Sequence, residues 1–172
     1  ISQLSSGGVR YEVVDKRQKG RKIDVRFNAA LYPEQQVAAE KMLYNDIGVL
    51  AAATAFGKTV LGAYLIAKKK VNALVLVHNV EIMNNWIKDL NSFLTINEEL
   101  PTYTTPKGRV KKRSSLIGTF SSQKGATTGI IDIAMITSLG REDNINELVR
   151  NYGMVIVDEC HRGSAKEESR WR

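Results

Sequence analysis

Apolar residues in this chain form short continuous runs that alternate with longer stretches of helical periodicity. Buried strands are predicted at 48–53, 73–77, 133–136 and 154–157, and helices at 34–43, 58–70, 80–94 and 145–149. Runs that are apolar on both faces are typical of central parallel strands. Strands that alternate with helices indicate βαβ units. The pattern therefore predicts an α/β fold in which helices cover a mainly parallel sheet.

Two other segments follow different patterns. Alternating residues at 9–15 and 22–27 flank a basic stretch, which predicts a short β-hairpin with a basic tip. Residues 101–129 are rich in Thr, Ser, Gly and Lys, and predict a long surface excursion with one short strand at most. We therefore expect an N-terminal extension with a β-hairpin at 1–27 and one larger domain at 28–172.

Composition narrows the class of protein. With 172 residues, 43% of them hydrophobic, the chain can bury a core, which excludes wholesale disorder. No apolar run approaches the ~20 residues of a membrane-spanning helix, so no membrane partner is expected. The one cysteine excludes an internal disulfide and favours a cytoplasmic protein. The chain begins with Ile1 and shows no leader, so we expect a piece of a longer protein.

The segment 52–59 (AATAFGKT) joins a predicted strand to a predicted helix, as a phosphate-binding loop does. Such a loop directs backbone N–H groups at an anion, a lysine at the β/γ-phosphates and a hydroxyl at Mg²⁺. The predicted nucleotide-binding residues of the loop are Ala55, Phe56, Gly57, Lys58 and Thr59. The first glycine of the general motif is replaced by Ala52, and the simpler interpretation is a chance Gly-Lys-Thr at a helix start.

Two carboxylates follow the last predicted strand. Asp158 is placed to hold Mg²⁺ together with Thr59, and Glu159 to orient or deprotonate water. The simpler alternative is a pair of solvated acids at a strand end. Cys160 is expected to be a small buried residue. His161 is either a hydrogen-bonding residue or a link between nucleotide and nucleic-acid sites.

At this point the chain resembles the first RecA-like domain of a superfamily 2 helicase, and more narrowly DEAD/DEAH-like DNA helicases and restriction-enzyme motor subunits. The resemblance covers five segments between about Phe27 and His161. These are 31–36 (LYPEQQ, Q motif), 52–59 (motif I), 74–86 (motif Ia), 131–139 (motif Ib) and 158–161 (DECH, motif II). Family members usually have glycine at the position of Ala55 and often a basic residue at the Asn79-Val80 turn.

The resemblance implies a three-layer RecA-like P-loop NTPase domain that uses ATP and Mg²⁺. It implies that Gln35 reads adenine, that Lys58, Asp158 and Glu159 act in hydrolysis, and that His161 couples the two sites. Thr137 and Ser138 would touch the nucleic-acid backbone, with DNA expected more than RNA. The chain ends before motif III, and the second RecA-like domain, which supplies an arginine to the reaction, would belong to the same parent chain.

Positive charge is concentrated in two runs that contain no acid. Lys+Arg exceed Asp+Glu by 25 to 18, a formal +7. One run spans 16–22, and the other holds Lys107, Arg109, Lys111, Lys112 and Arg113. Such runs favour sequence-independent phosphate contacts, with Tyr103 available for base stacking; solvated loops are the equal alternative.

Two further functions stay open. A small P-loop kinase would use the same loop, although the adjacent Asp158-Glu159 pair favours water as the phosphoryl acceptor. A non-enzymatic nucleic-acid-binding module with a degenerate nucleotide site is the other, because Ala52 and Ala55 replace glycines.

Overall fold

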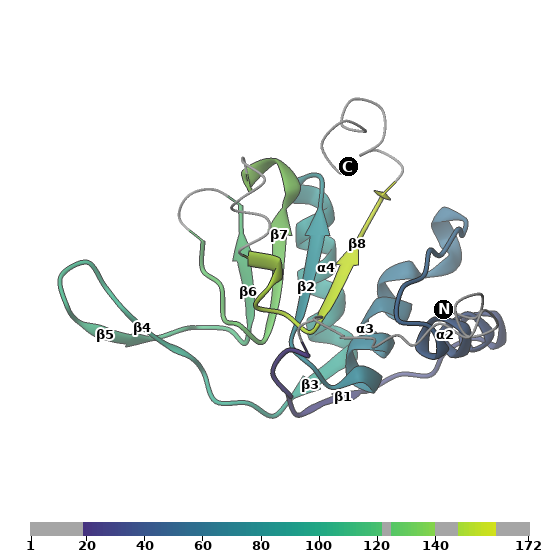
Figure 1. Ribbon diagram of the computed structural model, residues 1–172, viewed down its shortest axis with the longest axis horizontal. Helices are drawn as coiled ribbons and strands as arrows, with labels where there is room; N and C mark the ends of the chain where they lie inside the picture. The colour runs from purple at the N-terminus through teal and green to yellow at the C-terminus, as the bar shows by residue number, and fades with distance from the viewer. Residues whose placement is uncertain (1–18, 122–124, 140–147, 161–172) are drawn as a thin grey trace, which may run out of the picture.

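The computed structural model describes residues 19–121, 125–139 and 148–160, and its centre is a four-stranded parallel sheet. The strands are β6 (Ile117–Phe120), β7 (Ile131–Met135), β2 (Ala73–Val77) and β8 (Met154–Val157), in that spatial order (Figure 1). All of β2 is buried, with Leu74 between Asp132 of β7 and Val155 of β8. This arrangement confirms the predicted α/β fold with a parallel sheet.

In the described part of the chain, α3 (Lys58–Lys69) and α4 (Val80–Phe93) pack against the sheet, and α2 (Pro33–Tyr44) packs against α3. Asn79 is the N-cap of α4: its side-chain oxygen accepts a hydrogen bond from the Ile82 N–H at 2.8 Å. This bond satisfies one of the backbone N–H groups that the first turn of a helix leaves without a partner. Short 3-10 turns occur at η1 (Thr54–Phe56) and η2 (Ile136–Ser138). The predicted helices at 34–43, 58–70 and 80–94 are confirmed.

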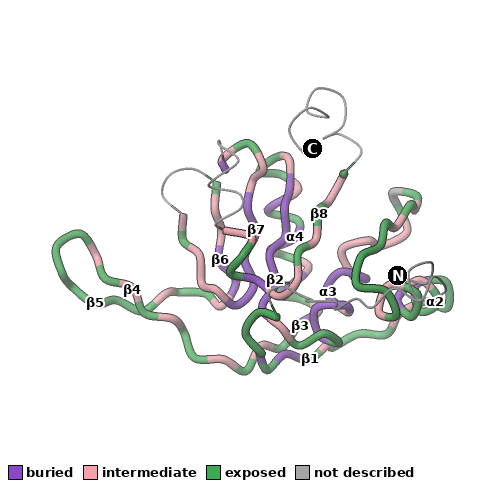
Figure 2. Tube along the Cα trace, in the orientation of Figure 1, coloured by how far each residue is buried: buried purple, intermediate pink, exposed green. Residues whose placement is uncertain are grey.

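Alternate residues of β2 face two different cores. Val75 and Val77 pack with α3 and α4, whereas Leu74 and Leu76 pack with Leu139 and residues 148–152. Helices therefore cover one face, and the chain around β7 and β8 covers the other. Figure 2 shows buried residues along β2 and β7 of this sheet, whereas β8 is intermediate or exposed. None of the helices in the described residues has both the length and the apolar character needed to cross a membrane.

The predicted strand at 48–53 is not formed. These residues have no strand structure, and Val49 is 81% exposed. A strand needs a neighbour to satisfy its N–H and C=O groups. Strand β8 is an edge strand of the sheet, where Val157 is 45% exposed, and segment 48–53 does not pair with it. The apolar composition of this segment therefore gave a wrong strand prediction.

The surface excursion holds more structure than expected. Residues 117–120 form β6, a strand of the main sheet that pairs with β7 and is buried over its first two residues. Before it, β4 (Thr102–Thr104) and β5 (Val110–Lys112) form an antiparallel hairpin that projects from the β6 side of the molecule (Figure 1). The prediction of at most one short strand here was wrong.

Strand β1 (Val25–Phe27) pairs antiparallel with β3 (Leu94–Ile96), directly after α4. Its predicted hairpin partner, 9–15, lies outside the described residues. Residues 19–22, the described part of the predicted basic tip, are bound to the rest of the molecule. The Asn72 N–H donates to the Arg21 carbonyl at 2.7 Å, and the Asn72 side-chain oxygen accepts from the Arg21 N–H at 2.9 Å. This stretch of backbone is therefore held against the amino end of β2.

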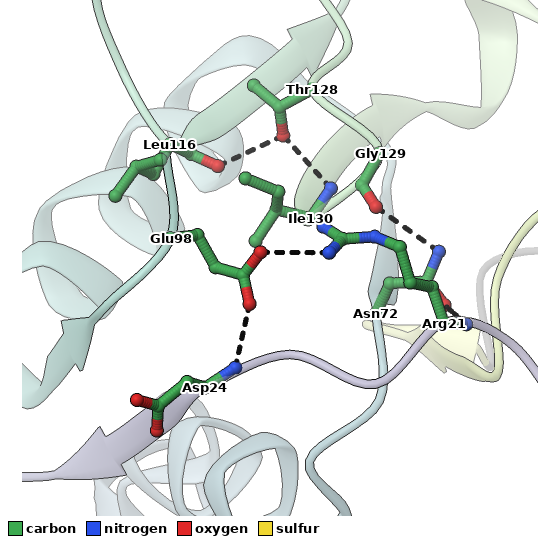
Figure 3. Close-up of polar contacts among 8 residues, drawn as sticks. All are labelled: Arg21, Asp24, Asn72, Glu98, Leu116, Thr128, Gly129 and Ile130. Carbon is green, nitrogen blue, oxygen red and sulfur yellow. Dashed lines mark hydrogen bonds and ion pairs between the residues drawn. The ribbon is translucent and has the colours of Figure 1, made fainter. Parts of the chain in front are cut away.

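An ion pair closes the same region (Figure 3). The Arg21 guanidinium donates to Glu98 Oε2 at 2.8 Å, and the Asp24 N–H donates to Glu98 Oε1 at 2.8 Å. These bonds hold the pKa of the Glu98 carboxyl below its usual range, with the Arg21 hydrogen bond as the larger cause. Glu98, two residues after β3, therefore fastens this part of the chain to the segment that leads into β1.

Asp132 of β7 is a fully buried acid. It accepts hydrogen bonds from the backbone N–H groups of Thr128 and Gly129, each at 2.7 Å, and from the Tyr152 hydroxyl. Burial, and then the charge of Asp132, raise the pKa of Tyr152 well above its usual range. Because a buried carboxylate is costly unless it is hydrogen-bonded, we interpret this cluster as a structural anchor of the loop before β7.

Candidate nucleotide-binding site

The predicted phosphate loop turns sharply into α3. After the single turn η1, Gly57 takes φ 79° and ψ 45°, in the left-handed region, and α3 starts at Lys58. Two features favour glycine here. The left-handed backbone conformation is easily adopted only by glycine. A Cβ at this position would also lie 2.7 Å from the Gln35 Nε2 atom. The loop therefore presents little side-chain bulk at the helix start.

Gln35 holds this loop in place. It is 4% exposed; its Nε2 donates to the Phe56 carbonyl at 2.7 Å, and its Oε1 accepts from the Tyr32 N–H at 2.9 Å. The side chain thus joins the start of α2 to the turn before Gly57. Sequence reasoning singled out Gln35 for adenine recognition, and this stays a prediction. Its hold on Phe56 was not anticipated, because residues 21 positions apart gave no pattern.

The amino end of α3 suits an anion. Its first turn contains no acidic residue, and its helix dipole places partial positive charge at Lys58 and Thr59. Both residues are half-buried and come directly after the turn at Gly57. The backbone N–H groups of a first helical turn have no partner within the helix, so they can donate to phosphate oxygens.

The acid pair lies where β8 ends. The Asp158 N–H donates to the Leu76 carbonyl at 2.9 Å, which continues the ladder with β2. Asp158 Oδ1 accepts from the Glu159 N–H at 2.9 Å, and Oδ2 accepts from the Trp86 indole N–H at 2.8 Å. Glu159 has φ 56°, so the chain turns as it leaves the sheet. Asp158 is thereby fixed in orientation from two sides.

Trp86 links the acid pair to the phosphate-loop helix. Its ring is 2% exposed and packs on Gly62, where a Cβ would lie 2.5 Å from the ring. Gly62 is four residues after Lys58 and so lies on the same face of α3, one turn on. The hydrogen bond from Trp86 to Asp158 was not anticipated from the sequence.

The oxygen donors at hand fit Mg²⁺. A carboxylate at Asp158 and a hydroxyl at Thr59 are hard ligands, which Mg²⁺ prefers together with phosphate oxygens and water. Within the described ranges, no group of three or more His, Cys, Asp or Glu side chains could enclose a metal. A magnesium ion here would therefore need oxygens from a bound nucleotide.

The remaining predicted residues are Thr137, Ser138, Cys160 and His161. Thr137 is exposed in η2 after β7, and the neighbouring Ser138 hydroxyl donates to the Ser121 carbonyl at 2.6 Å. Both follow a strand end, as Asp158 does, so they lie at the same edge of the parallel sheet. His161 lies outside the described residues. Cys160 is exposed, so the prediction of a buried cysteine was wrong: it follows the turn at Glu159, which leaves the core.

His78, which sequence reasoning passed over, directly follows β2 at this edge. Its Nε2 atom is shielded from solvent and has no hydrogen-bond partner in the part of the chain described here. A shallow, mostly apolar groove of about 400 Å³ also adjoins the loop. It is lined by residues of α2, by residues 49–52 and by Phe56.

The five predicted nucleic-acid residues of the second basic run lie apart from this edge. Lys107, Arg109, Lys111, Lys112 and Arg113 all belong to the hairpin of β4 and β5 or its turn. Figure 1 shows this hairpin beyond β6, whereas β8 and its acid pair are at the opposite edge of the sheet.

Two known helicase-named proteins are similar to this chain over most of its length. The chain is similar to the putative ATP-dependent RNA helicase L396 of Acanthamoeba polyphaga mimivirus, with 24% identity over 85% of the chain and 25% of the relative. It is also similar to the putative helicase 161L of Invertebrate iridescent virus 6, with 23% identity over 90% of the chain and 33% of the relative. The chain thus spans a quarter to a third of these relatives.

A family model matches most of the chain. The model described as "Type III restriction enzyme, res subunit" matches residues 28–172, which include the phosphate loop and the acid pair. The match and the two helicase relatives agree with the parallel sheet in supporting an ATP-dependent helicase-type domain of superfamily 2. The chain therefore belongs to the ResIII family.

Proposed function

We propose that this chain is the ATP-binding first motor domain of a nucleic-acid-dependent ATPase that moves along or unwinds DNA. One observation carries the proposal. Trp86 contacts both Gly62, one turn into the phosphate-loop helix, and Asp158 of the acid pair, so the two halves of the proposed site share one buried side chain.

Each site residue has a role in this proposal. Lys58 neutralises charge on the β- and γ-phosphates, and the backbone of Ala55, Phe56 and Gly57 surrounds them. Bound Mg²⁺, held by Thr59 and Asp158, supplies charge neutralisation on the phosphates. Glu159 orients the attacking water and accepts its proton. Gln35 holds the loop, and adenine recognition by the same amide is part of the proposal.

Nucleic acid is the proposed partner because the chain is basic and belongs to a helicase-type family. Thr137 and Ser138 are the proposed backbone contacts at the nucleotide edge, with His161 as the coupling residue. The mimivirus relative is named an RNA helicase, so the turnover experiment below compares stimulation by DNA with stimulation by RNA. A second RecA-like domain of the same parent chain completes the motor and supplies an arginine to the reaction.

Titration of a fluorescent ATP analogue against three forms of the chain tests the nucleotide site. Wild type and Lys69→Ala should bind alike, because Lys69 is exposed in the last turn of the same helix. Lys58→Ala should bind at least about tenfold more weakly, since it loses a charge-assisted contact worth roughly 1.5–3 kcal/mol. Equal affinity of Lys58→Ala and Lys69→Ala would overturn the phosphate-loop assignment.

ATP turnover, measured in the protein with both motor domains, distinguishes a nucleic-acid motor from a binding module and from a kinase. Stimulation by duplex DNA supports the DNA motor, and stimulation by RNA alone would move the proposal to RNA. Nucleic-acid binding without ATP binding would identify the degenerate module instead. Turnover that requires a small phosphoryl acceptor would identify a kinase.

A further inference from the structure

The hairpin of β4 and β5 is a two-stranded ribbon that carries a high density of positive charge. No acidic residue occurs between Leu100 and Ile131, and five cations occur between Lys107 and Arg113. All three residues of β5 are exposed. None of the five cations forms an ion pair with any residue that the structure describes. Mutual repulsion of these charges opposes the ribbon, which as an isolated hairpin is already marginal.

The pairing of the ribbon sorts these cations onto faces. Tyr103 pairs with Lys111, and two backbone bonds extend the ladder: the Thr105 N–H donates to the Arg109 carbonyl at 2.8 Å, and the Arg113 N–H to the Pro101 carbonyl at 2.7 Å. Side chains alternate between faces along a strand. Arg109, Lys111 and Arg113 therefore lie on one face, which we call the arginine face, and Lys112 lies on the other.

A contact between side chains supports this assignment. The Arg113 guanidinium lies over the ring of Tyr103 at 4.3 Å from its centroid, so both belong to the arginine face. The stacking orders Arg113 and keeps its charge at the ribbon surface. It also covers one side of the Tyr103 ring, which leaves base stacking by Tyr103 a lesser role than the sequence suggested.

We propose that the arginine face of this ribbon binds the phosphate backbone of duplex DNA without sequence preference. The inference rests on the proposed nucleic-acid-dependent function and names its contact face. Alternate residues of a strand are about 6.8 Å apart. Each strand of duplex DNA carries one phosphate every 3.4 Å or so of helix axis, so a row of three cations meets several phosphates. The ribbon lies at the β6 side, away from β8, so it can hold DNA while ATP is bound (Figure 1).

Two neighbouring lysines give a matched test. Lys111→Ala and Lys112→Ala remove the same charge from adjacent, exposed positions of β5, but on opposite faces. Binding of a labelled duplex DNA is measured by fluorescence anisotropy at several salt concentrations, in the wild-type chain and in each variant. Lys111→Ala should reduce the slope of log affinity against log salt by about 0.9, whereas Lys112→Ala should reduce it by less than half as much. The pair Arg109→Ala with Lys111→Ala should weaken binding on the order of tenfold.

The outcomes separate this inference from the proposed function. If Lys111→Ala and Lys112→Ala weaken binding equally, the face assignment is overturned. If the wild-type chain binds ATP but no duplex DNA, the ribbon inference fails and the nucleotide site stands. Tighter binding of single-stranded DNA or RNA of the same sequence would overturn the choice of duplex DNA. ATP affinity should be unchanged in every ribbon variant, and thermal unfolding should show that each one folds.

Discussion

The indole N–H of Trp86 donates a hydrogen bond to the Asp158 carboxylate across 2.8 Å, from α4 to the end of β8. The two residues are 72 positions apart in sequence and meet only because β2 and β8 are neighbours in the sheet. The ring also rests on Gly62 of α3. A shift of α4 would therefore be transmitted to both the proposed metal ligand and the phosphate-loop helix.

We predict that Trp86→Phe weakens Mg²⁺-dependent ATP binding. Phenylalanine keeps an aromatic ring against Gly62 but removes the donor that orients Asp158. A hydrogen bond to a charged group is worth roughly 1.5–3 kcal/mol, so the affinity at a fixed Mg²⁺ concentration should fall on the order of tenfold. Binding in the presence of EDTA should be unchanged, because only the metal-dependent part involves Asp158. A fluorescent-ATP titration at several Mg²⁺ concentrations measures both values.

Asn85→Ala, an exposed change on the same helix, is the control for this experiment. Gly62→Ala provides a second test, since its Cβ would displace the Trp86 ring without removing the indole. It should weaken the same Mg²⁺-dependent binding. Identical Mg²⁺ curves for wild type and Trp86→Phe would show that Trp86 has only a packing role.

We also predict that Gln35→Ala weakens both ATP and GTP binding, with the larger loss for ATP. The Gln35 amide holds the Phe56 carbonyl next to Gly57, and this contact shapes the loop whatever base is bound. Loss of a buried hydrogen bond of this kind costs about 1–3 kcal/mol, or roughly 5- to 150-fold in affinity if the loop loosens fully. Parallel titrations with labelled ATP and GTP report the ratio. Equal losses for ATP and GTP would overturn adenine recognition and leave Gln35 its hold on the loop, and no loss for either would remove Gln35 from the site.

Strong periodicity was enough to predict the central elements. The run at Ala73–Val77 is apolar throughout and became the fully buried β2, and the stripe at Met83, Trp86 and Leu90 became the core face of α4. In these segments local preference and tertiary packing agree. The loop and acid pair were also visible, because glycine, lysine and carboxylates at strand ends are hard to explain by packing alone.

Pairing between distant segments could not be predicted. The segment 48–53 has the composition of a strand but no paired neighbour, whereas Ile117–Phe120, within a polar excursion, is recruited into the sheet beside β7. Whether an apolar run becomes a strand depends on an available sheet edge, which no local pattern reveals. The links of Gln35 to Phe56 and Trp86 to Asp158 were missed for the same reason.

Removal of one hydroxyl should destabilise the loop before β7. Tyr152→Phe deletes a hydrogen bond to the buried Asp132 carboxylate and leaves its backbone donors in place. We expect the free energy of unfolding to fall by about 1–3 kcal/mol, since the acceptor is charged and buried. Urea unfolding followed by circular dichroism measures the change. Tyr44→Phe, at a tyrosine that is 91% exposed, should have no effect. A Tyr152→Phe protein as stable as wild type would show that Asp132 does not need this bond.

The ion pair of Arg21 and Glu98 should give stability that depends on pH. Its hydrogen bonds lower the pKa of Glu98 in the folded state, below the value of about 4.3 for an unperturbed glutamate. The stabilisation is therefore present above that value and is lost as the pH falls through the lower pKa of the folded state.

Glu98→Gln should be less stable than wild type near neutral pH by at most ~1 kcal/mol, because Arg21 is half-exposed. Urea unfolding from neutral pH to about pH 3 should show the two proteins converging, whereas Glu99→Gln, at an exposed neighbour, should follow wild type throughout. A difference that persists unchanged at the lowest pH would show that the Glu98 charge does not contribute.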